Sequence, residues 1–392
     1  MKKVYLDYSA TTPVKREVLE AMMPYLTEQY GNPSSLHQFG RDSKKAIDQA
    51  RDQIAQTLRA KPGEIYFTGG GSEADNWAIK GTALALQEKG RHLITTAIEH
   101  HAVLHTCEYL EKQGFEVTYL PVDETGIISL TDLKSAIRKD TILISVMHAN
   151  NEIGTLQPIE EIGVIARENG ILFHSDAVQT YGHMVIDTST LPVDLLSVSA
   201  HKLYGPKGVG ALYIRQGVRI LNLIHGGGQE KRKRAGTENI AGIVGFGKAA
   251  ALAYEDVESH ARRLTALRDD LTNRLMTAIP NTRLNGHREK RLCNNVNISF
   301  QYIEGESMLL SLDMVGIGAS SGSACTSGSL DPSHVLLAIG LNHETAHGSL
   351  RLTLGDMTTQ DEIDYVIEQL PPIVQRLRDM SPLYEQAKEE SL

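Results

Sequence analysis

Between about residues 72 and 215, short apolar runs alternate with stretches that carry a helical pattern of apolar and polar positions. Each run is rich in Val, Ile, Leu and aromatic side chains, which is typical of buried strands. The runs lie at residues 93–97, 117–120, 142–146, 171–174, 195–198 and 211–214. Strands that alternate with helices predict a mostly parallel sheet with helices on both faces. We therefore expect an α/β domain.

Polar residues follow three of these predicted strands, at the points where the strands end. They lie at residues 148–151, 176–179 and 199–202. The carboxyl ends of parallel strands meet at one edge of a sheet, and ligands of open α/β sheets bind in the crevice beyond that edge. The polar side chains are therefore expected to converge on one site.

The pattern changes after about residue 240. A long helical stretch rich in Ala and Leu runs to about residue 279 and is followed by a break that contains Pro, Asn and Gly. Beyond it come strand-like runs at 295–300 and 350–354 and helical patterns near 304–315 and 359–380. The chain exceeds the length at which one hydrophobic core stops growing. We predict a large α/β domain over residues 15–256 and a smaller α+β domain formed by residues 1–14 and 257–392.

Composition and charge exclude several classes of protein. The 392 residues are 41% hydrophobic and 22% charged, close to the averages for soluble globular proteins. The formal net charge of -9 disfavours a surface built to coat nucleic acid or an anionic membrane. The N-terminus lacks the apolar segment of a signal peptide, and no apolar run is long enough to span a bilayer. We expect a cytoplasmic protein with no membrane partner and no direct contact with nucleic acid.

The three cysteines differ in their surroundings. They are too few and too scattered for a disulfide framework or a repeated metal-ligand pattern, so no metal site is predicted. Cys107 lies in a helical stretch and Cys293 beside a predicted strand, and both are interpreted as buried small hydrophobic residues. Cys325 lies among Ser, Gly, Ala and Thr residues, which leave room for a second reactant to approach the sulfur. We predict a reactive thiol at Cys325.

Lys202 follows a predicted strand and precedes a Gly-Pro turn. A lysine held there can form a Schiff base with an aldehyde cofactor, whereas a solvated turn lysine explains the same residues on their own. Asp176 ends the preceding strand, where a carboxylate can pair with the pyridinium nitrogen of pyridoxal 5'-phosphate (PLP) or cap a helix. Each segment alone leaves both interpretations open.

Two glycine-rich segments are candidates for binding a phosphate. Residues 69–72 precede a predicted helix, whose first backbone N–H groups attract anions, although a plain turn with Ser72 as the helix cap is equally compatible. Residues 225–237 join three glycines to the consecutive basic residues Lys231 to Arg234 and end at Thr237. That charge can face a phosphate, an anionic substrate, an RNA-like partner or solvent.

Together, these segments resemble the cysteine desulfurases of the NifS/IscS type, which are class V aminotransferase-like PLP enzymes of fold type I. The resemblance spans nearly the whole chain. The matching segments are residues 5–7, 10–12, 31–35, 67–76, 99–100, 148–154, 176–179, 199–206, 234–237, 321–327 and 349–351. The extended segment around Cys325 resembles the group with a long cysteine loop. The chain ends at Leu392, sooner than relatives whose longer C-terminal tail helps to dock a scaffold protein.

The resemblance implies a role for each matching residue. Lys202 would bind PLP as a Schiff base, Asp176 would pair with its ring nitrogen, and Gln179 would hydrogen-bond its phenolic oxygen. The phosphate would be held by Gly71, Ser72, Ser199 and His201, and by Thr237 of the neighbouring subunit of a homodimer. Asn151, which also borders the cofactor, and Arg351 would orient the substrate carboxylate. His100 would stack over the ring and move protons. Taken alone, His100 equally fits a helix cap or a surface position, and Arg351 a structural salt bridge.

The implied activity is removal of sulfur from L-cysteine, which gives L-alanine and a persulfide on Cys325. The persulfide would pass to an acceptor protein, either an iron-sulfur scaffold or a tRNA-thiolation enzyme, and the sequence does not choose between them. The alternative enzymes on the same fold are a selenocysteine lyase and an aminotransferase. A catalytically silent sulfur-trafficking or scaffold protein is the alternative from another class. The role of Lys231 to Arg234 stays open.

Overall fold

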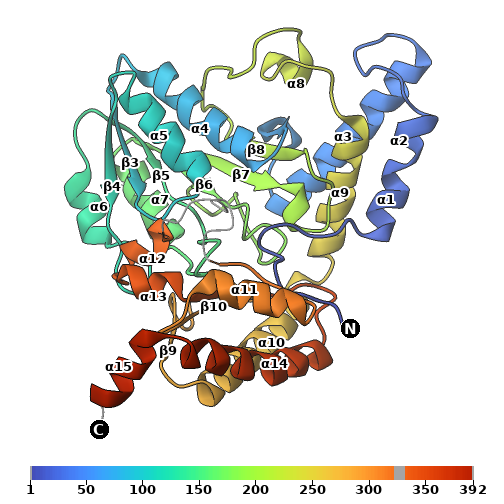
Figure 1. Ribbon diagram of the computed structural model, residues 1–392. Coiled ribbons are helices and arrows are strands. Elements are labelled where there is room, and N and C mark those ends of the chain that lie inside the picture. The colour runs from blue at the N-terminus through green and yellow to red at the C-terminus, as the bar shows by residue number, and fades with distance from the viewer. Residues whose placement is uncertain (1, 322–331, 391–392) are drawn as a thin grey trace.

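A computed structural model describes residues 2–321 and 332–390 and shows a larger body above a smaller one (Figure 1). The larger body contains a seven-stranded sheet. Its strands, in order across the sheet, are β2 (Ile65–Thr68), β8 (Gly210–Ile214), β7 (Leu195–Ser199), β6 (Leu172–Asp176), β5 (Thr141–Ser145), β3 (His92–Thr96) and β4 (Glu116–Leu120). The strands from β7 to β4 are parallel, and β8 is antiparallel to both of its neighbours. The predicted mostly parallel sheet is confirmed, with β2 as an additional strand at its edge.

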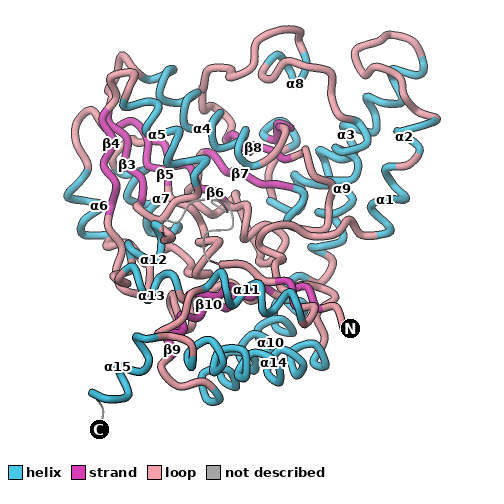
Figure 2. The backbone as a smooth tube through the Cα atoms, in the orientation of Figure 1, coloured by secondary structure: helices cyan, strands magenta, loops and turns pink. Residues whose placement is uncertain are grey.

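Helices cover both faces of this sheet, as the cyan and magenta segments of Figure 2 show. One face packs against α4 (Gly71–Leu86) and α5 (His101–Glu111). The other packs against α3 (Gln38–Leu58), α6 (Leu130–Ala136), α7 (Ile159–Glu168) and α9 (Ile240–Tyr254), and the larger body also holds α1 (Arg16–Met22), α2 (Pro24–Thr27) and α8 (Gln229–Arg232). Leu93 packs toward the first face and its neighbour Ile94 toward the second. This alternation explains why the strands are apolar at nearly every position.

The smaller body is built on an antiparallel sheet of three strands. Its elements are β9 (Thr282–Leu284), β10 (Asn295–Phe300), β12 (Ser349–Thr353), α10 (Val257–Ala278), α11 (Gly305–Met314), α12 (His334–Ala338), α13 (His343–His347), α14 (Gln360–Asp379) and α15 (Pro382–Glu390). The N-terminal strand β1 (Val4–Tyr5) pairs with β11 (Ile317–Gly318), and Val4 and Leu6 belong to the hydrophobic core of this body. These contacts support the predicted two-domain division, whose exact boundaries stay a prediction.

The long helical stretch predicted beyond residue 240 is divided into two helices. Helix α9 ends at Tyr254, and α10 begins at Val257 after Asp256, whose φ of −151° and ψ of 49° lie outside the helical region. Ala and Leu favour a helix throughout this stretch, so the sequence pattern does not reveal the break. The chain passes from the larger body to the smaller one at this point.

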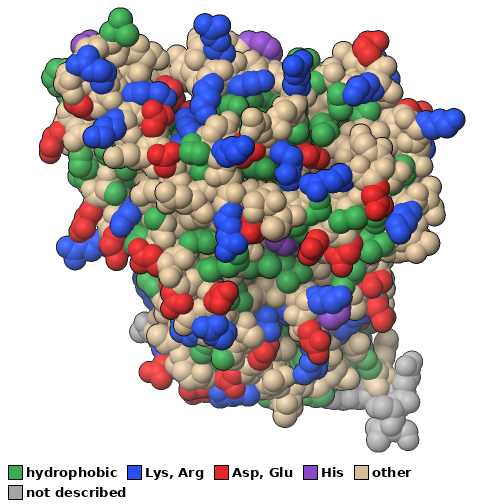
Figure 3. Space-filling view, turned by 180° about the vertical axis from the view of Figure 1, so that it is seen from behind, with side chains coloured by type: hydrophobic (Ala, Val, Ile, Leu, Met, Phe, Trp, Pro, Cys, Tyr) green, Lys and Arg blue, Asp and Glu red, His purple; other side chains and the backbone are tan. Residues whose placement is uncertain are grey.

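Charges of both signs are mixed over the rear face of the molecule, as Figure 3 shows. Elsewhere in the chain, exposed charges are often paired, such as Arg138 with Glu116 and Asp140, and Arg274 with Asp270 and Asp364. Neither sign of charge dominates the face that Figure 3 shows. Within residues 2–321 and 332–390, no helix combines the length and the apolar character that crossing a bilayer requires.

The connections of the sheet create a crevice between β3 and β5. The chain runs from β3 outward to β4 and then returns to β5 on the opposite side of β3. The loops that follow β3 and β5 therefore leave in opposite directions, which opens a gap at the carboxyl ends of these strands. A ligand site is expected in this gap.

A buried ion pair connects helix α3 to the basic segment near α8. Nη2 of Arg51 lies 2.7 Å from Oε1 of Glu230, and Nη1 lies 2.9 Å from Oε2. The side chains are 3% and 2% exposed. Glu230 also accepts a hydrogen bond from the backbone N–H of Phe67 at the end of β2. The pair thus holds the chain just before Lys231 against the sheet.

Replacing Glu230 with alanine is expected to lower the free energy of unfolding by about 3–5 kcal/mol, because it leaves the buried Arg51 without a counterion. Unfolding in urea measures this loss. The control is Glu20→Ala, which removes an exposed partner of Arg16 and is expected to change stability by less than about 1 kcal/mol. Equal losses in the two variants would contradict a special contribution of the buried pair.

Candidate active site

A cavity of about 380 Å³ lies at the carboxyl ends of the central strands. Its wall contains Ser9, Gly71, Ser72, Asp75, Glu99, His100, His101, Asn151, Glu152, Asp176, Gln179, Ser199, His201, Lys202, His334 and Arg351. Every predicted site residue within the described part of the chain lines this cavity except Thr237. The polar residues that follow separate strands therefore converge as expected.

Lys202 is held at the cavity rather than in a solvated turn. It ends a short 3-10 helix, Ala200–Lys202, directly after β7. Its Nζ atom donates to the backbone oxygens of Ser9 and Ala10, the latter at 2.7 Å. The N-terminal segment thus packs against the amine of Lys202. The surface-lysine interpretation of this segment is disfavoured by these contacts.

Asp176 lies at the end of β6 and is only 7% exposed. One of its oxygens accepts the N–H of Val178 at 2.8 Å, as a capping carboxylate would, although the chain makes a turn here and not an α-helix. Burial raises the pKa of Asp176 to about 6, and the charge of Lys202 opposes that rise. A buried carboxylate of this kind favours a cationic partner, such as a protonated ring nitrogen.

Another part of the wall has the features of an anion site. Helix α4 begins at Gly71 and directs its first backbone N–H groups toward the cavity edge. Any side chain at Gly71 would bring a Cβ atom within 2.7 Å of Val178. The buried Oγ of Ser199 has no hydrogen-bond partner in the part of the chain that the structure describes. A helix N-terminus and an unpaired buried hydroxyl fit a phosphate group, and with Lys202 and Asp176 they fit PLP.

His100 serves as a helix cap and also faces the cavity. Its Nδ1 accepts the N–H of Ala102 at 3.1 Å at the start of α5. Burial, followed by the charge of Lys202, lowers the pKa of His100 to about 4. The imidazole is therefore neutral near pH 7, and because Nδ1 accepts a hydrogen bond, its proton lies on Nε2, which acts as a donor. His100 thus caps a helix and also lines the cavity in which a cofactor ring would lie.

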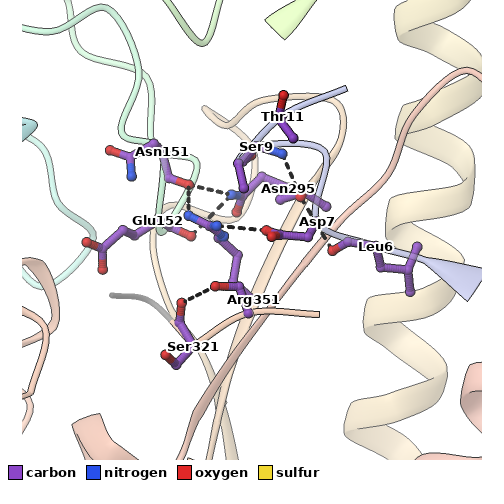
Figure 4. Close-up of polar contacts among 12 residues, drawn as sticks. Leu6, Asp7, Ser9, Thr11, Asn151, Glu152, Asn295, Ser321 and Arg351 are labelled. Atoms are coloured by element: carbon purple, nitrogen blue, oxygen red, sulfur yellow. Dashed lines mark hydrogen bonds and ion pairs between the residues drawn. The ribbon is translucent and has the colours of Figure 1, made fainter. Parts of the chain in front are cut away.

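Arg351 reaches the cavity from β12 of the smaller body (Figure 4). One Nη atom lies 2.9 Å from Oδ1 of Asp7, and the other donates to the backbone oxygen of Asn151 at 3.2 Å. Its buried Nε has no hydrogen-bond partner among the described residues. Arg351 thus forms a structural salt bridge and still keeps a donor for a carboxylate.

The side chain of Gln179 is hydrogen-bonded within the protein. Its amide nitrogen donates to the backbone oxygen of Ser9 at 3.1 Å. His201 contacts Thr11 through Nδ1 at 3.1 Å. Both residues are therefore positioned by the same N-terminal segment that covers Lys202.

Three buried carboxyl groups in the wall were not predicted from the sequence. Burial raises the pKa of Glu99 to about 8 and that of Glu152 to about 7. Burial, and then the charge of Asp176, raises the pKa of Asp75 well above its usual value. A signal was present, because Asp75 stands among Ala74, Trp77 and Ala78 on an otherwise apolar helix face. Protonated carboxyls make this wall less negative than its composition suggests.

Comparison with known proteins identifies the family of this chain. Residues 4–366 match the aminotransferase class-V family. The chain belongs to this family. A protein named cysteine desulfurase IscS, from Methanosarcina thermophila, is 62% identical over 382 residues, which are 97% of this chain and 94% of that protein. The predicted resemblance to cysteine desulfurases of the NifS/IscS type is confirmed.

Solved structures of class-V proteins agree with the fold. A NifS-like protein superposes with a TM-score of 0.91 at 40% identity and covers 96% of this chain and 100% of that one. A structure described as SspA in complex with cysteine has a TM-score of 0.80 at 41% identity, with 90% of this chain and 99% of that one covered. The predicted fold type I, with a large and a smaller body, is confirmed.

One predicted site residue of this class-V chain lies away from the cavity in the described structure. Thr237 is exposed and does not line the cavity of its own chain. Cys325 lies outside the described residues. The basic segment before Thr237 is partly paired, since Arg234 contacts Glu73 at 2.9 Å. A purely solvated face is thereby excluded for Arg234.

The chain on each side of the undescribed segment is attached to the cavity wall. Ser320 and Arg351 exchange backbone hydrogen bonds, at 2.7 and 3.2 Å. On the other side, Oγ of Ser333 donates to Glu152, and Nε2 of His334 lies 3.0 Å from the backbone oxygen of Glu99. The described residues on both sides of the segment that contains Cys325 are therefore attached to the cavity wall.

Proposed function

We propose that this chain is a PLP-dependent cysteine desulfurase that converts L-cysteine to L-alanine and receives the sulfur as a persulfide on Cys325. One observation carries the proposal. The cavity that brings together Lys202, Asp176 and Arg351 also anchors both ends of the segment that contains Cys325. A nucleophile on that segment is tied to the place where the substrate would bind.

The residues of the cavity divide into groups around the cofactor. Lys202 would hold PLP covalently, and Asp176 and Gln179 would contact its ring. The phosphate would be held by Gly71, Ser72, Ser199 and His201, with Thr237 contributed by the second copy of a homodimer. Asn151 would border both the ring and the substrate. When bound, PLP supplies an electron sink for the pair released at the α carbon of an amino acid.

Side chains of the protein would bind the substrate, transfer protons and accept the sulfur. Arg351 and Asn151 hold the carboxylate of the amino acid, and the amine of Lys202 removes its α proton. His100 would move a proton in the same cavity only when its Nδ1 gives up the hydrogen bond from Ala102. The Cys325 thiolate attacks the substrate sulfur, so that an S–S bond forms, the C–S bond breaks and the β carbon takes up a proton. Cysteine and the enzyme thiol thus become alanine and an enzyme persulfide without an external oxidant.

The partners remain proposals. A homodimer is supported by the exposed position of Thr237, which does not reach its own cavity. The acceptor of the persulfide would be a protein of iron-sulfur cluster assembly or of tRNA thiolation. The cytoplasmic location stays a prediction.

The test uses the purified enzyme with PLP and L-cysteine. Alanine is expected to form, and mass analysis is expected to show one added sulfur atom on the peptide that contains Cys325. Absence of that sulfur would contradict the mechanism. The aminotransferase alternative predicts a new amino acid when a 2-oxo acid is supplied, and the selenocysteine lyase alternative predicts a strong preference for the selenium substrate.

Replacing Arg351 with lysine is expected to raise the KM for L-cysteine by about 10- to 100-fold, because hydrogen bonds to charged groups contribute roughly 1.5–3 kcal/mol. A lysine cannot keep the contacts to Asp7 and Asn151 while it also pairs with a substrate carboxylate. Steady-state kinetics measure the change. Arg283→Lys on β9 of the same sheet is the control, since Arg283 does not line the cavity. An unchanged KM in Arg351→Lys would contradict the clamp.

A further inference from the structure

A second cavity, of about 360 Å³, lies behind the loop that carries Lys202. Five of its lining residues form a connected group, which we call the Asp356 cluster: Lys15, His183, Tyr204, His260 and Asp356. None of the five lines the first cavity. They come from the N-terminal segment, the larger body, helix α10 and the turn after β12, so the cluster joins both bodies of the protein.

Asp356 is the centre of this cluster. One carboxylate oxygen is paired with the ammonium of Lys15, and the other lies 3.0 Å from Nε2 of His260. Burial opposes ionisation, but the hydrogen bonds from His260 and Lys15 hold the pKa of Asp356 well below its usual range. The carboxylate of Asp356 is therefore ionised near neutral pH. Its contacts to Lys15 and His260 come from two different segments of the chain.

The cluster fixes the residue that lies two positions after Lys202. Tyr204 has a φ of 65°, a left-handed conformation that costs a non-glycine residue about 1–2 kcal/mol. Its hydroxyl accepts the backbone N–H of Asp356, and its ring lies 4.9 Å from the ammonium of Lys15. A Cβ atom at Gly355 would come within 2.5 Å of the Tyr204 hydroxyl, so the two segments approach closely. An uncommon backbone conformation beside the lysine is thus maintained from the smaller body.

His183 extends the cluster within the larger body. It lines the second cavity together with Leu203 and Tyr204, the two residues that follow Lys202. Burial, followed by the neighbouring His260, lowers the pKa of His183 to about 4, so its ring is neutral near pH 7.

The contacts form a continuous path. The rings of His183 and His260 stack with centroids 6.5 Å apart and planes inclined by 25°. Asp356 contacts His260, which stacks on His183, and the Tyr204 hydroxyl joins Asp356 directly to the loop of Lys202. That loop is therefore held by groups of the opposite body.

We propose that the Asp356 cluster positions Lys202 for its reaction, and that Asp356 and Tyr204 are positioning residues of this enzyme. The inference rests on the proposed function, because it assigns the cluster a purpose only if Lys202 holds the cofactor. Neither residue touches the first cavity, so an effect on the reaction must pass through the loop of Lys202.

The main variant is Asp356→Asn, which keeps the size of the side chain and removes its charge. Lys15 and His260 then lose their counterion, and Lys202 samples positions outside the reactive one. We expect kcat to fall on the order of 10-fold, with the KM for L-cysteine changed less than about twofold, since Asn151 and Arg351 are untouched. The absorbance of the Lys202-linked cofactor and the rate of borohydride trapping on Lys202 are expected to change together, and Asp356→Glu is expected to recover most of the loss.

A second variant tests the contact between Asp356 and the loop of Lys202. Tyr204→Phe keeps the ring beside Lys15 but removes the hydroxyl that accepts the backbone N–H of Asp356. It is expected to slow trapping of Lys202, as Asp356→Asn does. The control is Asp364→Asn, which removes the partner of Arg274 in the same body, away from both cavities.

The outcomes separate the inference from the proposed function. If the parent enzyme shows no cofactor on Lys202, the proposed function itself fails. If it does, and Asp356→Asn and Tyr204→Phe lower only the melting temperature while trapping, absorbance and kcat match the parent, the cluster merely stabilises the fold and the inference is overturned. Equal kinetic losses in Asp364→Asn would overturn it as well.

Discussion

Replacing Lys202 with alanine is expected to lower the rate of alanine formation from L-cysteine by at least about 10³-fold, because a general base alone contributes roughly 10²- to 10⁴-fold and the covalent attachment of the cofactor is lost with it. Lys202 is the amine that the structure holds between the strand end of β7 and the backbone oxygens of Ser9 and Ala10. Two measurements apply: alanine production, and the visible absorbance of the protein after PLP is added and free PLP is removed. Both are expected to disappear.

The control for this variant is Lys207→Ala, five positions later on the same loop. Lys207 is exposed and contacts the backbone oxygen of Thr12 at 3.4 Å, and it does not line the first cavity. It is expected to keep nearly full activity. A second variant, Lys202→Arg, preserves the positive charge but not the nucleophilic amine, and it should be as inactive as the alanine variant. Activity in Lys202→Arg would mean that charge, and not the amine, is what the site needs.

The main sheet could be predicted because its strands are apolar on both faces. Runs such as 142–146 are short and bounded by polar residues, which distinguishes them from helices. Strand β2 (Ile65–Thr68) was missed because the alternation of strands and helices was recognised only from residue 72 onward. The break between α9 and α10 was missed for a different reason, since propensity is uniform across it while tertiary packing decides where the chain turns.

Site residues that directly follow strands could be predicted from the sequence. Residues whose role depends on contacts with distant parts of the chain could not. Asp176 ends β6, and Ser199 ends the neighbouring strand β7, just before the short helix that ends at Lys202. The topology therefore brings these three residues together. The pairing of Arg351 with Asp7 joins positions 344 residues apart, and no local pattern announces it. The raised pKa values of Glu99 and Glu152 depend on complete burial, which is a property of the folded chain. His183 and Asp356 carry no motif at all, and their contacts alone single them out.

Replacing Cys325 with serine is expected to abolish persulfide formation and to reduce alanine formation to the background rate, because the hydroxyl is a far weaker nucleophile toward sulfur than a thiolate. Removal of the α proton by Lys202 does not need Cys325. Exchange of that proton for deuterium in D₂O is therefore expected to continue in Cys325→Ser and to stop in Lys202→Ala. The pair of variants thus divides the reaction into a lysine part and a cysteine part.

The other two cysteines cannot replace Cys325. Burial raises the pKa of Cys293 to about 11 and that of Cys107 far above its usual value, so both remain thiols near neutral pH and lie in hydrophobic cores. Cys293→Ala is accordingly the matched control and is expected to form the persulfide on Cys325 as the parent enzyme does. If Cys325→Ser still gained a sulfur atom, a buried thiol or a different chemistry would be responsible. If Cys325→Ser lost deuterium exchange as well, Cys325 would act on the α carbon. The assignment of proton removal to Lys202 and of sulfur attack to Cys325 would then be wrong.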